Sequence, residues 1–241
     1  MLRLDNVVKR FGGLVATDHM SFQVAPGESL GLIGPNGAGK TTIFSLIMGE
    51  HRPTSGSITL DGREISTLPT HRRIRLGVSR TYQVPRPFPE MTVAENIRVG
   101  LMPDRLSDML FRRPDRDAER DLALSVGFTE QDLTRLPSEL SMGDLRKLEL
   151  ARTLATGAKV LLLDEVFAGL TAGEIAQMSE LIQAKRAEGL TFIIVSHDLK
   201  ALEPLVDRTL AMAQGALIAE GPFAEVIAEP AVRAAYLGDA A

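Results

Sequence analysis

A glycine-rich loop ending in lysine and threonine lies in the first quarter of the chain. Residues 34–42 read GPNGAGKTT, and the first eight fit the pattern G-x-x-x-x-G-K-[ST]. Glycines let a backbone wrap closely around phosphate oxygens, with several N–H groups pointing inward. A lysine at this place reaches the β- and γ-phosphates of a nucleotide, and the adjoining hydroxyl binds Mg²⁺. The loop therefore predicts binding of Mg-ATP and, with it, ATP hydrolysis.

The residues of this loop have separate expected roles. Lys40 is expected at the outer phosphates and Thr41 on the metal. A helix with apolar periodicity from Thr41 to Met48 adds unpaired N–H groups and the positive end of its dipole. The alternative is a glycine-rich turn that only looks like a phosphate loop, but the flanking strand and helix patterns argue against it. The predicted nucleotide-binding residues of the loop are Gly34, Asn36, Gly37, Gly39, Lys40, Thr41 and Thr42.

Two neighbouring acids, Asp164 and Glu165, follow a short apolar run. Adjacent strand residues face opposite ways, so the two carboxylates can serve different purposes. Asp164 is expected to hold Mg²⁺ through its water shell. Glu165 is expected to orient and deprotonate the attacking water, an effect worth about 10²- to 10⁴-fold in rate. Without the phosphate loop, the pair would be interpreted as solvated charges at the end of a strand.

A histidine occupies the corresponding place after another apolar run. His197 follows residues 191–195, and we expect it to sense the γ-phosphate. A lone histidine is more often a structural hydrogen-bonding group, and only its place beside the other strand ends favours the functional interpretation. His19, His51 and His71 have no such context and are expected on the surface or in turns.

Three short apolar runs must position these groups. Residues 29–33, 160–163 and 191–195 are apolar on both faces of the pleat, the pattern of parallel strands covered by helices on both sides. Each run ends in glycine or polar residues, and ligands of open parallel sheets bind beyond the carboxyl ends of the strands. The phosphate loop, the acids and His197 should therefore meet in one crevice.

The remaining segments complete an α/β fold. The N-terminal stretch alternates weakly and predicts an antiparallel edge of the sheet, and helical periodicity recurs in 145–154 and 172–187. A hairpin turning at Gln214-Gly215 is expected within 209–220, followed by a helix that starts near Pro230. Proline- and arginine-rich residues without a strand pattern indicate a helical insertion. The predicted division is a nucleotide-binding core of 1–84 and 153–241 and a helical subdomain of 85–152.

Composition excludes several classes of protein. The 241 residues carry a formal net charge of −4, so no global positive field attracts nucleic acid, and no nucleic-acid partner is expected. The absence of cysteine excludes disulfides and thiolate metal sites. The N-terminus has charges among its apolar residues, unlike a signal peptide, and no apolar run approaches the roughly 20 residues of a membrane-spanning helix. These features predict a cytoplasmic protein.

A second serine- and glycine-containing segment, LSMGD at 140–144, precedes a helical pattern. Together with the phosphate loop and the acids, it resembles the LSGGQ signature of the nucleotide-binding subunits of ABC transporters, and the resemblance covers essentially the whole chain. It implies a P-loop NTPase (RecA-like) core with a mixed, largely parallel sheet, an antiparallel β edge subdomain and an inserted α-helical subdomain. It also implies that Ser141 and Gly143 contact the γ-phosphate held by a second subunit. Met142 and Asp144 depart from the signature.

The resemblance assigns further residues. Gln83 matches the glutamine of the Q-loop, which contacts Mg²⁺ and links hydrolysis to the membrane partner, and we count it among the catalytic and metal-binding residues. Phe11 matches the aromatic residue that stacks on adenine, although an ordinary core phenylalanine is the alternative. In the D-loop, Thr171 stands where the family has aspartate. Val166 replaces the usual proline after the glutamate.

Several segments resemble the branched-chain (hydrophobic) amino acid importer group within this family. They are residues 11–16, 80–83, 88–93 and the tail from 221 to 238. The implied partners are a second ATPase subunit, as a homodimer or heterodimer, transmembrane permease subunits and, indirectly, a solute-binding protein. The chain would then lie on the inner face of the cell membrane, with the Pro- and Arg-rich stretch 85–89 near a groove for a permease helix.

Other interpretations remain open. The solute of such an importer could instead be urea, a short amide or another amino acid. A regulatory ABC subunit that binds ATP without hydrolysing it is disfavoured by the presence of Glu165 and His197. A P-loop kinase or GTPase does not explain residues 140–144, and the chain lacks an obvious N-K-x-D guanine motif. A nucleic-acid-linked ABC ATPase is disfavoured by the acidic balance and the single phosphate loop.

Overall fold

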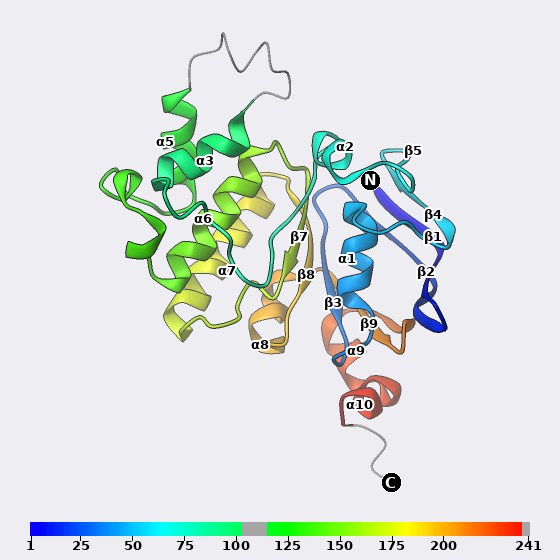
Figure 1. Ribbon diagram of the computed structural model, residues 1–241. Helices are drawn as coiled ribbons and strands as arrows, with labels where there is room; N and C mark the ends of the chain where they lie inside the picture. Colours follow the sequence, from blue (N-terminus) through cyan, green and yellow to red (C-terminus); the bar gives the residue numbers. More distant parts are fainter. Residues whose placement is uncertain (103–114, 238–241) are drawn as a thin grey trace.

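The computed structural model describes residues 1–102 and 115–237 of the chain. Residues 103–114 of the predicted helical subdomain and residues 238–241, which include Gly238 of the tail that resembles the family, lie outside the described residues. A six-stranded sheet runs through the centre, an antiparallel sheet flanks it on one side, and a group of helices lies on the other side (Figure 1). Within the described residues, no helix combines the length and apolarity needed to cross a membrane.

The central sheet has the order β10-β9-β3-β8-β7-β6. Its pairs are parallel except that of β9 with β10, and the three predicted buried strands, β3, β7 and β8, are confirmed. Strand β6 has only three residues and was not predicted from the sequence. The strands are β3 Ser29–Ile33, β6 Val78–Arg80, β7 Val160–Asp164, β8 Thr191–Val195, β9 Arg208–Ala213 and β10 Ala216–Gly221.

Alternate residues of the central strands face two different hydrophobic cores. Leu162 and Ile193 join a core with α1 and the antiparallel sheet. Their neighbours Leu163 and Ile194 join a second core on the other face, with α7 and the C-terminal helices. Because both faces are covered, the strands are apolar throughout, as the sequence predicts. The helices are α1 Lys40–Met48, α2 Thr70–Arg75, α7 Ala172–Ala187, α8 Leu199–Leu202, α9 Phe223–Ala228 and α10 Pro230–Leu237.

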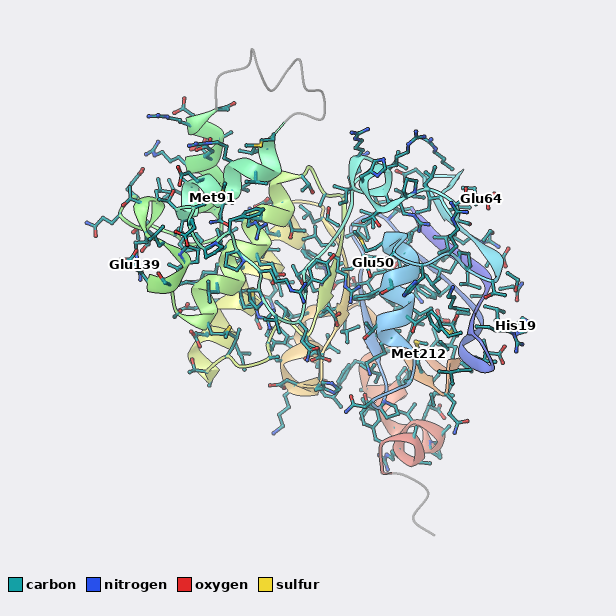
Figure 2. The ribbon with its side chains drawn as sticks, in the orientation of Figure 1. His19, Glu50, Glu64, Met91, Glu139 and Met212 are labelled. Atoms are coloured by element: carbon teal, nitrogen blue, oxygen red, sulfur yellow. The ribbon has the colours of Figure 1, made fainter. Side chains whose placement is uncertain are left out.

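The antiparallel sheet has the order β2-β1-β4-β5 and confirms the predicted edge subdomain. His19 lies in β2 with a φ of 48° and points away from the molecule at its periphery (Figure 2). The predicted hairpin between β9 and β10 is also present, with positive φ at Gln214 and Gly215. The strands of this sheet are β1 Leu2–Phe11, β2 Leu14–Val24, β4 Ser55–Leu60 and β5 Arg63–Glu64.

The described residues of the predicted helical subdomain contain helices and no strand. Their small core includes Val93, Ile97 and Leu148. Helix α6 continues past residue 152 and contributes Leu150 to the second core of the sheet, so it joins the two predicted units. The helical elements are α3 Val93–Leu101, α5 Arg116–Ser125, α6 Met142–Ala155 and the 3-10 turns Asp132–Thr134 and Pro137–Glu139, with a further 3-10 turn at Glu203–Leu205 in the core.

A fully buried arginine fixes the far end of the phosphate-loop helix. Arg73 of α2 is 0% exposed and donates to the carbonyl oxygens of Leu46 and Ile47 at 2.6 and 2.9 Å. It also donates to Ser66 O and Leu68 O, both at 2.9 Å. The last carbonyls of a helix have no partner within it, and a cation there also favours the helix dipole. Burial lowers the pKa of Arg73 to about 10, so the group remains charged at neutral pH.

Replacing Arg73 by methionine should therefore destabilise the core. We expect Arg73→Met to lower the free energy of unfolding by about 3 kcal/mol, because several buried carbonyls lose their partner. Denaturant unfolding followed by circular dichroism measures this loss. The matched control, Arg72→Met, changes an exposed arginine of the same helix and should cost less than about 0.5 kcal/mol. Equal losses in both variants would contradict the role of Arg73.

Candidate functional site

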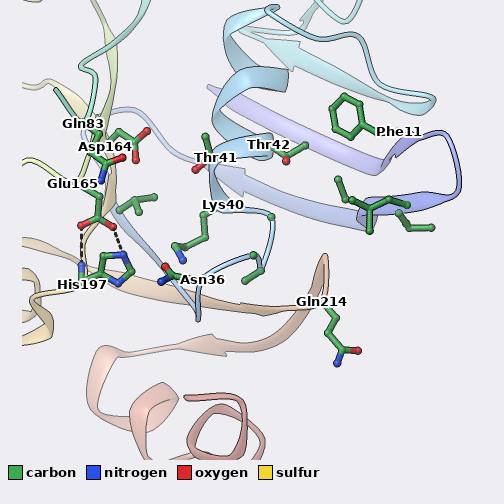
Figure 3. A pocket seen from close by; sticks show the side chains of 17 residues that line it. Phe11, Asn36, Lys40, Thr41, Thr42, Gln83, Asp164, Glu165, His197 and Gln214 are labelled. Atoms are coloured by element: carbon green, nitrogen blue, oxygen red, sulfur yellow. Dashed lines mark hydrogen bonds and ion pairs between the residues drawn. The ribbon is translucent and has the colours of Figure 1, made fainter. Parts of the chain in front are cut away.

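The carboxyl ends of β3, β7 and β8 open into one cavity of about 570 Å³ (Figure 3). Residues from the phosphate loop, the Q-loop, both acids and the third strand end line it together with part of the antiparallel sheet. The predicted site residues that line this cavity are Phe11, Asn36, Gly37, Gly39, Lys40, Thr41, Thr42, Gln83, Asp164, Glu165 and His197. The cavity is also lined by Leu14, Val15, Ala16, Ala38, Val195 and Gln214, which sequence reasoning did not assign to the site.

Two glycines of the phosphate loop are required by close backbone contacts. Gly39 has a φ of 103°, and a Cβ there would lie 2.5 Å from the carbonyl oxygen of Ala16. At Gly34, with a φ of 149°, a Cβ would lie 2.2 Å from the carbonyl oxygen of Met212. Both positions exclude side chains, which lets strand, loop and α1 pass close to their neighbours. Gly34 shapes the loop although it does not line the cavity.

Lys40 points back into the loop. Its Nζ donates to Gly34 O at 2.6 Å and to Pro35 O at 2.9 Å, and the residue is buried. Burial lowers the pKa of Lys40, while the charges of Glu165 and Asp164 act in the opposite direction. The ammonium and the two carboxylates therefore interact across the cavity. A buried cation at this place attracts an anion such as a phosphate group.

Glu165 and His197 form a hydrogen-bonded pair (Figure 3). The Nε2 of His197 lies 3.1 Å from Oε1 of Glu165, and the main-chain N–H of His197 donates to Oε2 at 3.1 Å. Glu165 is buried and has a φ of 50°, a left-handed conformation that costs non-glycine residues roughly 1 kcal/mol. Its own N–H donates to Val195 O at 2.9 Å. The carboxylate of Glu165 is thus held in one orientation by the neighbouring strand end.

Asp164 is held by two residues from the neighbouring strand, Arg80 of β6 and Thr81 after it. Arg80 Nη2 donates to Asp164 Oδ2 at 2.5 Å, and both side chains are buried. The main-chain N–H of Asp164 contacts Thr81 Oγ1 at 3.3 Å. Sequence reasoning used Arg80 only as a mark of the family subgroup. No local pattern could have assigned it to Asp164, because β6 was not predicted and the two residues are 84 positions apart.

The Q-loop is fixed by the helix that follows the signature segment. Arg146 of α6 donates to the carbonyl oxygens of Tyr82 and Gln83 at 2.8 and 2.6 Å. The N–H of Tyr82 donates to Glu149 Oε1 at 2.7 Å, and burial raises the pKa of Glu149. These bonds leave the exposed side chain of Gln83 on the wall of the cavity. A movement of α6 would therefore displace Gln83 directly.

Phe11 lies at the outer edge of the cavity, on β1. Phe11 is 42% exposed, so it is not an ordinary core phenylalanine. The ring packs edge-on against His51 at 5.1 Å between centroids, and Lys9 Nζ lies 4.8 Å from its centre. An exposed aromatic face beside a phosphate loop can stack on a nucleotide base. His51 was expected on the surface and is exposed, but sequence reasoning did not predict its contact with Phe11.

Ser141 and Gly143 do not line this cavity. They lie at the start of α6, where Ser141 Oγ accepts from the N–H of Asp144 at 3.1 Å. The N–H of Gly143 donates to Glu174 Oε1 at 3.0 Å, and a Cβ there would clash with the same oxygen. Thr171, in place of the aspartate, caps α7 with Glu174, and threonine and aspartate are both good N-cap residues. Ser141 and Thr171 therefore cap α6 and α7, and the carboxylate of Asp144 accepts from Ser141 Oγ at 3.1 Å.

A tyrosine near the C-terminal end also contacts the phosphate loop. The hydroxyl of Tyr236 on α10 accepts a hydrogen bond from the N–H of Gly34 at 2.8 Å. Burial raises the pKa of Tyr236. Sequence reasoning used Tyr236 only as part of the tail that resembles the family subgroup. The contact spans 202 positions in the sequence, so no local signal could have predicted it.

The donors in the cavity fit Mg²⁺. Thr41, Gln83 and Asp164 line the same cavity and offer a hydroxyl, an amide oxygen and a carboxylate. Mg²⁺ prefers oxygen ligands and is commonly held by one or two protein groups together with phosphates and water. Within residues 1–102 and 115–237, no group of three or more His, Cys, Asp or Glu side chains is placed to hold a metal. Thr41, Gln83 and Asp164 suit a cation that takes its other ligands from phosphates and water.

Comparison with known proteins places this geometry in a family. The ABC transporter family model matches residues 17–168, and the family described as branched-chain amino acid ATP-binding cassette transporter matches residues 216–241. A crystal structure of an ATP-binding cassette of an ABC transporter in its ADP conformation superposes with a TM-score of 0.88. It is 29% identical, and the match covers 99% of both chains.

Curated relatives match along the full length. The high-affinity branched-chain amino acid transport ATP-binding protein LivG of Salmonella typhimurium is 38% identical over 252 residues, covering 100% of this chain and 98% of LivG. The corresponding BraF protein of Pseudomonas aeruginosa is also 38% identical, with the same coverage. The chain therefore belongs to the ATP-binding subunits of ABC transporters, in the group of branched-chain amino acid transport proteins, and it hydrolyses ATP.

Proposed function

We propose that this ATPase drives the import of branched-chain or related hydrophobic amino acids. The observation that carries the proposal is the full-length similarity to LivG and BraF, together with the match of the C-terminal segment 216–241. Import direction and solute rest on this similarity. In such a transporter the solute contacts lie on the membrane subunits, so the cavity described above serves ATP.

The phosphate loop and Phe11 hold the nucleotide in this proposal. Lys40 exchanges its contacts with loop carbonyls for the β- and γ-phosphates, and Phe11 stacks on adenine. Thr41, Asp164 and Gln83, which line the cavity, would hold Mg²⁺. When bound, Mg²⁺ neutralises charge on the phosphate oxygens. The loop N–H groups and the N-terminus of α1 bind the same phosphates.

Glu165 is the proposed base. It takes a proton from water that attacks the γ-phosphate, and its fixed orientation reduces the cost of positioning that water. The ring of His197 bonds the same carboxylate and is 56% exposed toward the cavity, where it can also contact the γ-phosphate. Phosphoryl transfer depends largely on position and charge, so displacement of either group slows hydrolysis.

A second ATPase subunit completes the site. Ser141 and Gly143 lie outside the cavity of their own chain, and Met142 beside them is 44% exposed. We propose that this signature segment contacts the γ-phosphate on a second subunit, in a homodimer or heterodimer arranged head to tail. ATP then favours the closed dimer, because it binds that state better, and hydrolysis reopens it.

Permease subunits are the proposed membrane partners. A cavity of about 390 Å³ lies beside the Q-loop and is lined by Tyr82, Arg86, Gly100 and Arg152, among others. Arg152 stacks over Phe88 at 4.8 Å and donates to Arg86 O at 2.7 Å, which holds the predicted docking stretch 85–89 against α6. We propose that this cavity receives a helix of a permease subunit on the inner face of the membrane. A solute-binding protein would act only through the permease.

The competing interpretations differ in measurable ways. An importer for urea, a short amide or another amino acid would use the same ATP site, so only transport separates it from the proposal. A regulatory subunit would bind ATP without turnover, even with its membrane partners. The fixed Glu165–His197 pair supports hydrolysis.

The base assignment predicts the behaviour of Glu165→Gln. This variant should bind ATP within about threefold of the parent affinity but hydrolyse it at least about 10²-fold more slowly, because glutamine cannot accept the proton. With ATP present, the variant should persist as a dimer in size-exclusion chromatography with light scattering. Glu180→Gln, an exposed change on α7, is the control and should behave as the parent. Undiminished turnover in Glu165→Gln would remove Glu165 from this role.

If the solutes are branched-chain amino acids, their uptake by the cell should depend on this ATPase. Deleting the gene should abolish high-affinity uptake of radiolabelled leucine, isoleucine and valine by the cell, while uptake of labelled urea should stay unchanged. A copy of the parent gene should restore transport. A copy carrying Lys40→Ala should not, because the loop loses the charge that binds the phosphates. Unchanged leucine uptake together with lost urea uptake would favour the alternative solute.

A further inference from the structure

One charged side chain beside the ATP site has no part in the function proposed above. Arg80 ends β6, and its guanidinium is buried between the metal-ligand carboxylate and the end of α1. On one side, Nη2 donates to Asp164 Oδ2 at 2.5 Å. On the other side, Nη1 lies 3.3 Å from Glu50 Oε2 and 3.4 Å from Ser45 Oγ. The guanidinium therefore lies between two carboxylates.

The residues around Arg80 confine its guanidinium but do not fix it against either Asp164 or Glu50. The rings of Phe44 and Tyr82 lie 5.5 and 5.3 Å from its guanidinium carbon and confine it to a narrow slot. Its buried Nε has no hydrogen-bond partner among the described residues. Only the terminal nitrogens are bonded, so a small rotation can move the charge from Asp164 toward Glu50. Glu50 follows α1 and remains partly exposed to solvent, with its side chain 30% exposed (labelled in Figure 2).

Arg80 and a metal ion must share the same carboxylate. A cation paired with Asp164 reduces the negative potential that Mg²⁺ meets there, and two cations repel each other strongly in a buried site. Glu50 offers the guanidinium a second partner when Mg²⁺ takes Asp164. Hydrogen bonds from Ser45 at 2.8 Å and from the Tyr82 hydroxyl at 3.3 Å hold Glu50 in place for this exchange.

We propose that Arg80 is a positioning residue that acts as the resident counter-ion of Asp164 and opposes Mg²⁺ binding until it turns toward Glu50. The inference rests on the proposed Mg²⁺ site at Asp164. Arg80 would change how much Mg²⁺ strengthens nucleotide binding, and it would not contact the reacting atoms. Its consequence is that the pairing state of Arg80 sets how much Mg²⁺ strengthens ATP binding.

Calorimetry on the purified chain tests this coupling without turnover. The dissociation constant of the non-hydrolysable analogue AMP-PNP is measured in EDTA and in excess Mg²⁺. The value in EDTA divided by the value in Mg²⁺ gives a ratio that measures how much the metal strengthens binding, and this ratio is compared between variants. Arg80→Gln should raise the ratio about tenfold, because the competing charge is gone. Arg80→Lys keeps a positive charge and should stay within about threefold of the parent ratio. An unchanged or smaller ratio in Arg80→Gln overturns the proposal.

Two further variants separate this effect from a general loss of an ion pair. Glu50→Gln removes the second partner of Arg80 and should lower the ratio, and this variant serves also if Arg80→Gln does not fold. Arg98→Gln breaks another arginine pair, with the buried Glu119 at 2.6 Å, and should leave the ratio unchanged. A ratio raised in Glu50→Gln would also overturn the proposal. If the parent chain itself shows no effect of Mg²⁺, the proposed metal site fails instead.

Discussion

The site depends on charges of opposite sign gathered at one edge of a buried parallel sheet. Lys40 begins α1, directly after the phosphate loop that follows β3, and Asp164 and Glu165 come from the end of β7. Each is buried, and a buried charge is costly unless others compensate for it. Arg80 and Lys40 together balance the two carboxylates. The site is therefore an electrostatic unit, in which a change at one group alters the others.

This unit is held in place by packing on both faces of the sheet. The two hydrophobic cores fix the strands, and Arg73 fixes the end of α1 that lies away from the phosphate loop. The left-handed conformation of Glu165 persists because the strand end beside it supplies hydrogen bonds to its side chain and its N–H. Contacts from Arg146 then connect the Q-loop to α6, so the helical part is mechanically linked to the cavity.

Much of the fold could be predicted from local patterns. Three unbroken apolar runs predict the buried strands, the turn chemistry of Gln214-Gly215 predicts the hairpin, and helical spacing predicts the helix from Ala172 to Ala187. The structure contains all of them. The convergence of the strand ends follows from the rule that parallel strands share a carboxyl edge. The predicted contact of Ser141 and Gly143 with a γ-phosphate on a second subunit came from family resemblance alone. A single chain does not test it, because both residues lie outside the cavity of their own chain.

The groups that sequence reasoning missed are defined by contacts between distant segments. Strand β6 is too short to show a period, so the place of Arg80 beside Asp164 was hidden. Arg73 has the sequence context of a solvated helix in an arginine-rich stretch, yet it is fully buried. Tyr236 reaches the phosphate loop from the C-terminal helix. In each case the partner is a buried carbonyl, carboxylate or N–H group that only the folded chain brings near.

The position of a metal ion is the most direct test of the central claim. Crystals of the chain grown with AMP-PNP and Mn²⁺ in place of Mg²⁺ would locate the metal by its anomalous scattering. We expect the manganese peak between the Thr41 hydroxyl and Asp164, with the outer phosphates beside Lys40 and Glu165. A peak remote from Asp164, or a triphosphate that does not contact Lys40, would contradict it.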